Sequence, residues 1–402
     1  MNGVPHAQSM QSLLPGAAMP AFTRLPPLSL YVHVPWCVRK CPYCDFNSHE
    51  PRGELPEKAY IAALLSDLDA ALPGVWGRPV QTVFIGGGTP SLLSPDAMDT
   101  LLSGVRARLP LTADAEITLE ANPGTVEAEK FAGFRAAGIN RLSLGIQSFN
   151  DGHLRALGRI HDAAEACSAV DVALRHFDNV NLDLMYGLPG QLPEEAVADI
   201  DRAIAFGPAH LSAYHLTIEP HTWFAHHPPA LPDHDVVADM QGLLESRLAV
   251  AGYSHYEIAA FARDGRRCRH NLNYWQFGDY LGIGAGAHGK ISFTNKVMRE
   301  SRPRSPADYL ASAGQPAAVR RGEVSPADLP GEFMMNALRL VEGFGLALFT
   351  ERTSLSSSVL LQALATAEGQ GLIHRDALRV CPTERGRHFL NDLMTLFLAD
   401  ST

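Results

Sequence analysis

Three cysteines lie within eight residues of one another, in the sequence HVPWCVRKCPYCDF. Cys37, Cys41 and Cys44 are separated by three and then two residues, and the other three cysteines are scattered along the chain. An odd number of close cysteines does not suit disulfide pairing, whereas closely spaced thiolates are the usual ligands of iron–sulfur clusters. Three such ligands on a four-iron cluster would leave one iron open to a small molecule. A zinc site is the alternative, with His33 or His49 as its fourth ligand.

Glycines and single polar residues follow other apolar runs in the same half of the chain. Residues 86–89 (GGGT) end the second such run, where glycines allow close approach of a ligand and amide donors suit its polar end. Glu120, Gln147 and Asp183 lie at or within the next three runs. A charged side chain inside an apolar strand is costly unless it is paired. We therefore expect Asp183 to face a ligand or Arg159.

These residues sit in a regular alternation of short apolar runs and helical patterns. Near-continuous apolar strands joined by helices indicate a parallel sheet with right-handed crossovers. Six such units are fewer than the eight of a closed barrel, so we predict an α/β fold with a partial (β/α)6 barrel. A doubly wound sheet is the alternative, and in both folds ligands gather at the C-terminal ends of the strands. The predicted strands are 30–34, 82–85, 116–120, 141–146, 180–186 and 210–216.

The alternation stops after Leu216, and the remaining chain has a different character. The glycine- and aromatic-rich stretch 274–289 is expected to form a loop, and 372–384 a small β-hairpin among helices. The predicted division is a flexible segment 1–27, the barrel 28–225, a connecting segment 226–305 and a smaller, mainly helical C-terminal domain 306–402.

Composition excludes several classes of function. The 402-residue chain carries a formal net charge of −10, which disfavours a nucleic-acid binder, and acidic residues also outnumber basic ones in 316–402. No apolar run reaches the roughly 18 to 20 residues that a membrane span needs. The N-terminus has no secretory pattern, and the unpaired cysteines suit a reducing compartment. We therefore expect a cytoplasmic protein without a membrane span.

The cysteine spacing, with Tyr43 directly before the last cysteine, resembles the signature of the radical S-adenosylmethionine (SAM) superfamily. The resemblance implies a [4Fe–4S] cluster held by Cys37, Cys41 and Cys44, with SAM bound to the open iron. From about residue 29 to residue 398 the chain further resembles the oxygen-independent coproporphyrinogen oxidases and their paralogues, the heme chaperones of the HemW type. The resemblance is seen in the sequences YVHVP and NLDLMYGLP and in the C-terminal region.

The same resemblance assigns residues to SAM. Residues that match those holding SAM at the cluster of the oxidases are Tyr31, Gly87 and Glu120. Residues that match a second SAM site of the oxidases are Gly88, Thr89, Gln147, Arg159 and Asp183. Their presence leaves open whether one or two SAM molecules bind.

Two departures separate the paralogues. The oxidases carry a fourth cysteine two positions after the third, where this chain has Phe46, and they begin with a longer segment before the barrel. Both differences match the chaperone pattern. We therefore favour a chaperone that binds heme and delivers it to acceptor haemoproteins such as respiratory-chain subunits, with a homodimer as one assembly to test. The alternative is an oxidase that decarboxylates two propionates of a porphyrinogen.

The sequence HNLNYW, which begins at His270, resembles the His-Asn-x-x-Tyr-Trp motif of the HemW type. An imidazole can serve as an axial heme ligand, so His270 is the predicted heme-binding residue, with Cys268 as an alternative. Tyr274 and Trp275 offer flat apolar area to a porphyrin face. The arginines expected to meet the heme propionates are Arg266, Arg267 and Arg269. A purely structural role is the competing interpretation, in which His270 caps a buried turn.

Overall fold

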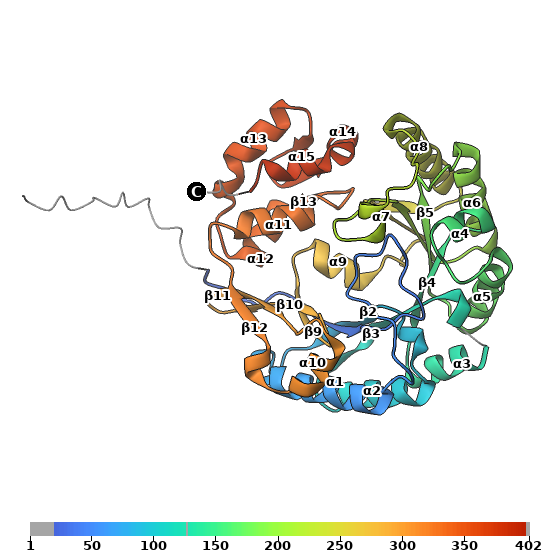
Figure 1. The fold of residues 1–402 in the computed structure, drawn as a ribbon. Coiled ribbons are helices and arrows are strands. Elements are labelled where there is room, and N and C mark those ends of the chain that lie inside the picture. Colours follow the sequence, from blue (N-terminus) through green and yellow to red (C-terminus); the bar gives the residue numbers. More distant parts are fainter. Residues whose placement is uncertain (1–19, 126–127, 399–402) are drawn as a thin grey trace, which may run out of the picture.

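A single large sheet organises the chain in the computed structural model, which describes residues 20–125 and 128–398. Its twelve strands follow the order β12-β11-β10-β9-β1-β2-β3-β4-β5-β6-β8-β7, and β1 to β6 are mutually parallel. All six predicted strands are present, and Figure 1 shows them curving into an open barrel. They are β1 Leu28–Val34, β2 Val80–Gly87, β3 Leu111–Ala121, β4 Arg141–Gln147, β5 Val180–Tyr186 and β6 His210–His215. The partial-barrel prediction is confirmed.

Helices between these strands cover the outer face of the sheet (Figure 1). On α1, the buried residues Tyr60, Ile61, Leu64 and Leu68 recur at the helical spacing that the sequence predicts. The crossover helices are α1 Glu57–Ala71, α2 Pro95–Arg106, α3 Ala128–Ala137, α4 Asp151–Ala156, α5 Ala163–His176 and α6 Pro193–Phe206. No helix within 20–125 or 128–398 is long and apolar enough to cross a bilayer.

The connecting segment adds strands to both edges of the barrel sheet, so the loop expected at 274–289 is wrong. Strand β9 Asp279–Ile283 lies parallel to β1, and β10 His288–Phe293 continues the sheet. Glycines made this stretch resemble a loop, but close packing requires them here: a Cβ at Gly282 or Gly284 would collide with a neighbouring backbone carbonyl. The other elements of this region are α7 Trp223–His226, α8 His234–Val250, β7 Ser254–Glu257, β8 Ala260–Ala262, α9 Arg269–Trp275 and β11 Lys296–Ser301.

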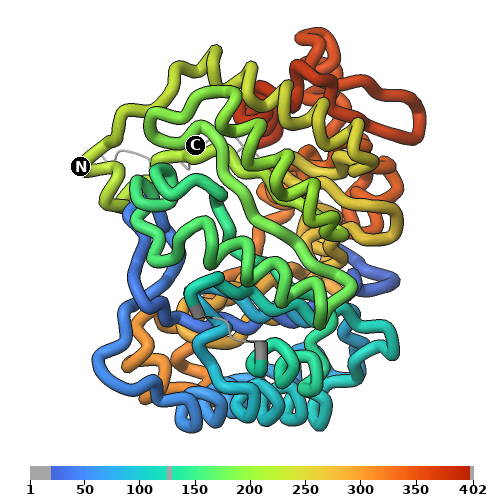
Figure 2. Tube along the Cα trace, turned by 90° about the vertical axis from the view of Figure 1, so that its right-hand side faces the viewer, coloured from blue at the N-terminus to red at the C-terminus, as the bar shows by residue number. Residues whose placement is uncertain are grey.

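The C-terminal region is mainly helical, as predicted from the sequence, and it provides most of a second hydrophobic cluster. Figure 2 shows its helices at the opposite end of the molecule from α1 and α2. The predicted hairpin is present as β14 Ile373–Arg375 and β15 Arg379–Pro382, and β13 Phe344–Gly345 completes a small sheet. The helices of the C-terminal region are α11 Leu329–Ala337, α12 Leu346–Thr353, α13 Leu361–Gly369, α14 Glu384–His388 and α15 Leu390–Thr395. Between barrel and cluster, α10 Pro306–Ser312 packs on α1, and β12 Arg320–Glu323 is one of the two edge strands of the large sheet. The boundary at 305/306 stays a prediction.

A buried ionic network holds the added strands to the barrel. The carboxylate of Asp279 at the start of β9 is completely buried and accepts from Lys290 Nζ and Arg78 Nη2, each at 2.8 Å. The backbone amide and the hydroxyl of Ser292 also donate to it. Because Lys290 is itself buried, each charge depends on the other for its stability.

Candidate functional site

The three clustered cysteines lie on the loop that directly follows β1, at the C-terminal ends of the parallel strands. Backbone hydrogen bonds hold this loop in place: the Cys37 amide donates to the His49 carbonyl at 3.0 Å, and the Cys44 amide to the Cys41 carbonyl at 3.1 Å. A third bond, from the Thr89 amide to the Trp36 carbonyl at 2.7 Å, ties the loop to the glycine-rich turn after β2. The position of the cysteines agrees with the sequence prediction.

The surroundings of the sulfur atoms suit an iron–sulfur cluster. All three thiols are half-buried and form no disulfide. Thr89 Oγ1 donates to Cys37 Sγ at 3.4 Å, and Arg159 Nη1 to Cys41 Sγ at 3.7 Å. Burial raises the pKa of Cys37 and of Cys44, so a positive partner is needed to keep them as thiolates. The iron ions of a bound cluster would supply that positive charge, and the hydrogen-bond donors beside the sulfur atoms also stabilise the thiolates.

The residues that the structure describes offer no ligand set for a single zinc ion. Among these residues, no three histidine, cysteine, aspartate or glutamate side chains gather around one point. Thiolates of a cluster bind different irons, so they need not converge in this way. His33, one possible fourth zinc ligand, has both ring nitrogens engaged, with the Tyr31 hydroxyl at 3.0 Å and the Asn47 carbonyl at 2.9 Å. His49 Nε2 lies 3.3 Å from the Asn47 side-chain oxygen.

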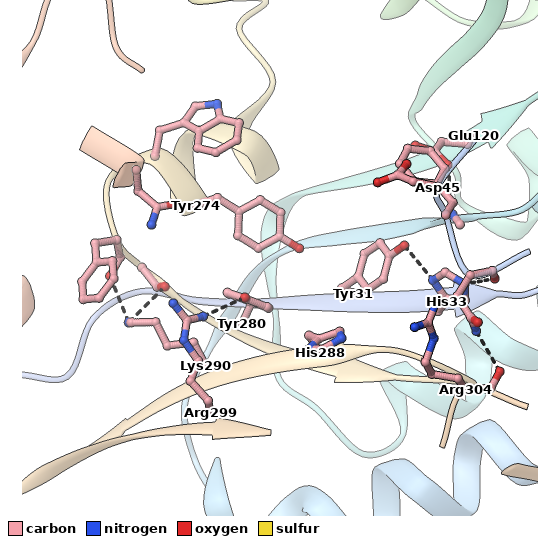
Figure 3. Close-up of a pocket in the computed structure, with 18 residues that line it drawn as sticks. Tyr31, His33, Asp45, Glu120, Tyr274, Tyr280, His288, Lys290, Arg299 and Arg304 are labelled. Atoms are coloured by element: carbon pink, nitrogen blue, oxygen red, sulfur yellow. Dashed lines mark hydrogen bonds between the residues drawn. The ribbon is translucent and has the colours of Figure 1, made fainter. Parts of the chain in front are cut away.

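A cavity of about 600 Å³ opens beside the cysteine loop (Figure 3). Tyr31, Gly87 and Glu120, the residues expected to hold the SAM of the cluster, all line it. Its aromatic lining is Tyr31, Phe46, Tyr274, Trp275, Phe277 and Tyr280, and its basic side chains are His33, His288, Lys290, Arg299 and Arg304. The structure thus brings the expected SAM residues together with two aromatic residues of the HNLNYW motif.

Glu120 lies at the end of β3, where the Gly87 amide donates to its Oε2 at 3.0 Å. Burial, and next the charge of Asp183, raises the pKa of Glu120 to about 8. The side chain is therefore mostly protonated at pH 7 without a ligand. An ammonium group or sugar hydroxyls placed against it would favour the carboxylate.

The raised pKa of Glu120 predicts a pH-dependent stability. A carboxyl whose folded pKa exceeds its unfolded value of about 4.3 makes the fold less stable as pH rises from about 4.3 to 8. Glu120→Gln removes the ionisation, so we expect the variant to be more stable than the unmodified protein at pH 8.5, by roughly 1 to 3 kcal/mol, but not at pH 5. Urea unfolding at both pH values measures this. Glu194→Gln, on the exposed surface of α6, is the control, and identical pH dependence in all three proteins would contradict the prediction.

The glycines after β2 permit close contact with the chain's own cysteine loop. A Cβ at Gly87, whose φ is +113°, would collide with the His33 ring. A Cβ at Gly88 would collide with the Trp36 carbonyl, which is the acceptor for the Thr89 amide. Gly88 therefore sets the distance between the β2 turn and the cysteine loop, and Gly87 leaves room for the His33 ring of β1.

We expect Gly88→Ala to displace the cysteine loop and to lower the iron bound per chain after anaerobic reconstitution. Crowding of this kind costs roughly 1 to 3 kcal/mol. Gly242→Ala, where the added Cβ on α8 meets nothing within 4 Å, is the matched control and should keep full iron content. Equal iron in the two variants would show that the contact with Trp36 does not position the loop.

Residues expected at a second SAM site are only partly gathered. Thr89 and Arg159 border a separate cavity of about 20 Å³, which has room for little more than one water molecule. Gln147 ends β4 with a positive φ of 68°. In this structure the second group therefore does not enclose a space of SAM size.

Asp183 does not face Arg159, so that part of the expectation is wrong. Its carboxylate accepts from the Ser143 hydroxyl and the Asn181 amide, each at 2.8 Å. Arg159 instead donates to the Asn122 side-chain oxygen at 2.6 Å and to the Gly145 carbonyl at 2.7 Å. Burial raises the pKa of Asp183, whereas these neutral donors and the positive charge of Arg141 act in the opposite direction.

His270 is buried behind the cavity wall rather than exposed to the cavity. Nδ1 lies 2.8 Å from Thr82 Oγ1, and Nε2 lies 2.9 Å from the Tyr274 hydroxyl. Burial is the main cause that lowers the pKa of His270 to about 3. In this arrangement His270 orients Tyr274, which does line the cavity. Cys268 is fully buried, and burial raises its pKa to about 12.

The arginines beside the motif are directed elsewhere. Arg267 forms an ion pair with Glu342, and Arg269 with Asp114 at 3.1 Å. None of the three arginines lines the cavity, so their expected contact with heme propionates stays a prediction that this cavity does not support. The basic side chains of β10 and β11 were not identified from the sequence as part of a site. The signal was present on β10, because His288 and Lys290 are two residues apart and therefore lie on one face of the strand.

Comparisons with known proteins agree with this geometry. The sequence profile of the Radical SAM superfamily matches residues 31–203, and that of the HemN C-terminal domain matches 324–389. "Heme chaperone HemW" of Escherichia coli K12 is 51% identical over 94% of this chain and 100% of that protein. The protein of the same name from Mycobacterium tuberculosis H37Rv is 38% identical over 88% and 93%. The solved structure of coproporphyrinogen III oxidase (HemN) from Escherichia coli, described as a radical SAM enzyme, superposes with a TM-score of 0.79, at 25% identity over 93% of this chain and 91% of that one.

Proposed function

The chain belongs to the HemW heme chaperone family of the radical SAM superfamily, and we propose that it binds heme in the cavity beside its cysteine loop and passes it to acceptor haemoproteins. The cavity supports this proposal, because its aromatic lining suits a flat apolar ring and its basic side chains suit the carboxylates of that ring. The single observation that favours carriage over oxidation is Phe46. It takes the position of the fourth cysteine of the oxidases, and its exposed ring borders the cavity.

The cofactors of the superfamily, a [4Fe–4S] cluster and SAM, belong to the proposal. Cys37, Cys41 and Cys44 would hold the cluster, which supplies one-electron chemistry when it is bound. The residues proposed to hold SAM at the cluster are Tyr31, Gly87 and Glu120. The residues proposed for a second SAM site are Gly88, Thr89, Gln147, Arg159 and Asp183. Of these, Thr89 and Arg159 donate to cysteine sulfurs, so their first role is to stabilise the thiolates.

The proposed contribution of His270 to heme binding is indirect. Its Nε2 is occupied by the Tyr274 hydroxyl, so it acts on the cavity through the position of that ring. Direct ligation of iron by His270 would require Tyr274 to move first.

Heme titration and an anaerobic activity assay test the proposal together. Stoichiometric formation of a Soret band in the full-length protein is the expected result, with no protoporphyrinogen formed from coproporphyrinogen III in the presence of SAM and a reductant. Formation of protoporphyrinogen at the rate of an enzyme, without stoichiometric heme binding, would favour the oxidase alternative.

Acceptors, assembly and compartment are parts of the proposal. Haemoproteins of the respiratory chain are the proposed acceptors, a homodimer the proposed assembly and the cytoplasm the proposed compartment. Heme transfer from the loaded protein to apo-acceptors, followed by the Soret shift of each acceptor, tests the first. Sedimentation analysis with and without the reconstituted cluster tests the second.

A further inference from the structure

One wall of the cavity is formed by β9, β10 and β11, and it carries the basic side chains. His288 and Lys290 are two residues apart on β10, so both side chains lie on the same face of the sheet. Tyr280 on β9 and Arg299 on β11 pair with Lys290 and share that face. Figure 3 shows His288 on this wall between Arg299 and Arg304, beside Tyr31 of the same sheet.

His288 differs from His33 and His270 in being free. Both ring nitrogens of His33 are hydrogen-bonded, and so are both of His270. His288 is exposed to the cavity, and its side chain makes no hydrogen bond with any residue of the described chain. Among the described residues it is therefore the histidine of the cavity whose nitrogens are available to a ligand.

The surroundings of this imidazole favour its neutral form. Burial, and next the charges of Arg299, Arg304 and Arg302, lowers the pKa of His288. A neutral imidazole is the form that binds a metal ion. The acidic groups facing the cavity, Asp45 and Glu120, are not among the causes of this shift.

Other side chains of the cavity are less suited to bind iron. Burial raises the pKa of the three tyrosines of the lining, Tyr31, Tyr274 and Tyr280, so their phenolate forms are disfavoured. Lys290 is buried in its ion pair with Asp279. The cysteines of the loop do not line this cavity.

We propose that His288 is the axial ligand to the iron of heme in this cavity, and that Arg304 and Arg299 bind the carboxylates of the same heme. The inference rests on the proposed heme-binding function and names the residues that would perform it. A cavity of about 600 Å³ is within the range of sites that hold a flat organic cofactor. Arg304 is the freer of the two guanidinium groups, because Arg299 also pairs with Glu332 at 2.6 Å.

Ferric heme titrated into the full-length protein tests the ligand. We expect His288→Ala to weaken heme binding at least tenfold and to shift the Soret band, and we expect added imidazole to restore the original band. His226→Ala, on the exposed surface of α7, is the matched control and should behave as the unmodified protein. Restoration by imidazole also shows that the His288 variant is folded.

The other outcomes distinguish this inference from the proposed function. An unchanged Soret band and affinity in His288→Ala, with both lost in His270→Gln, would overturn the ligation by His288 while heme binding itself stands. A failure of the unmodified protein to bind heme stoichiometrically would instead overturn the proposed function.

The carboxylate contacts are tested with heme dimethyl ester, in which both propionates are esterified. The unmodified protein should bind free heme at least several-fold more tightly than the ester, and Arg304→Gln should lose this preference. Arg269→Gln, in an arginine paired with Asp114 outside the cavity, should keep it. A preference that survives in Arg304→Gln and disappears in Arg269→Gln would show that the propionates bind beside the HNLNYW motif.

Discussion

Replacing Cys41 with serine is expected to reduce the iron and labile sulfide bound per chain, after anaerobic reconstitution, to background. The loop offers three thiolates, and because position 46 is a phenylalanine, the loop has no fourth cysteine that could replace Cys41 as a ligand. A hydroxyl at position 41 would lose both the soft sulfur ligand and its contact with Arg159 at 3.7 Å. Iron and sulfide analysis of the same samples measures the effect.

Cys167→Ser provides the matched control for this experiment. Cys167 lies half-buried on α5, where its sulfur contacts Arg202 Nη2 at 3.6 Å, far along the chain from the loop. Serine there should leave iron and sulfide unchanged. A Cys41→Ser protein that retained a full complement of iron would rule out this loop as the site of the cluster.

Replacing Asp279 with alanine is expected to lower the free energy of unfolding by about 3 to 5 kcal/mol, because it leaves Lys290 buried without its counter-charge. Burial raises the pKa of Asp279, but the charges of Lys290 and Arg78 outweigh it and the net pKa is lowered. The stabilisation is therefore present above the unfolded value of about 3.9 and is lost as pH falls through the lower folded value. Urea unfolding at pH 7 gives the main measurement, and the loss relative to the unmodified protein should shrink in strong acid.

An exposed ion pair supplies the comparison. Asp69 bonds Arg108 at 2.7 Å with half of its side chain in water, so Asp69→Ala should cost less than about 1 kcal/mol. Adding Lys290→Met to Asp279→Ala should recover part of the loss, since it removes the unpaired ammonium group. Similar losses from Asp279→Ala and Asp69→Ala would show that the buried pair contributes no more than a surface pair.

The barrel and the position of its cysteine loop were predictable from the sequence because both depend on local signals. Strands buried on both faces require continuous apolar runs, and the thiolates of a cluster are close together in the chain. Strands β9 and β10 were not predictable in this way. At Gly282 and Gly284 the backbone lies against another carbonyl, and only a glycine fits there, which removes the apolar signature of a strand.

The directions of side chains near the HNLNYW motif were also beyond the sequence. Helix α9 begins where the Glu116 carboxylate accepts the amides of Arg269 and His270, at 3.1 and 3.0 Å. Glu116 lies on β3, far away in the sequence, yet it fixes how the helix is rotated. That rotation turns His270 into the core and directs Arg269 toward Asp114, so the cavity receives Tyr274 instead.

The pairing of β1 with β9 has a consequence for how the chain folds. Leu30 lies beside Leu281, so the first strand finds this neighbour only after more than two thirds of the chain has been synthesised. Contacts between residues so distant in sequence slow folding, because the entropy of closing the intervening loop must be overcome first. On the ribosome, the free edge of β1 therefore stays unpaired, beside the nascent cysteine loop, until β9 emerges. A chain stalled before residue 283 would expose that edge and be prone to aggregation.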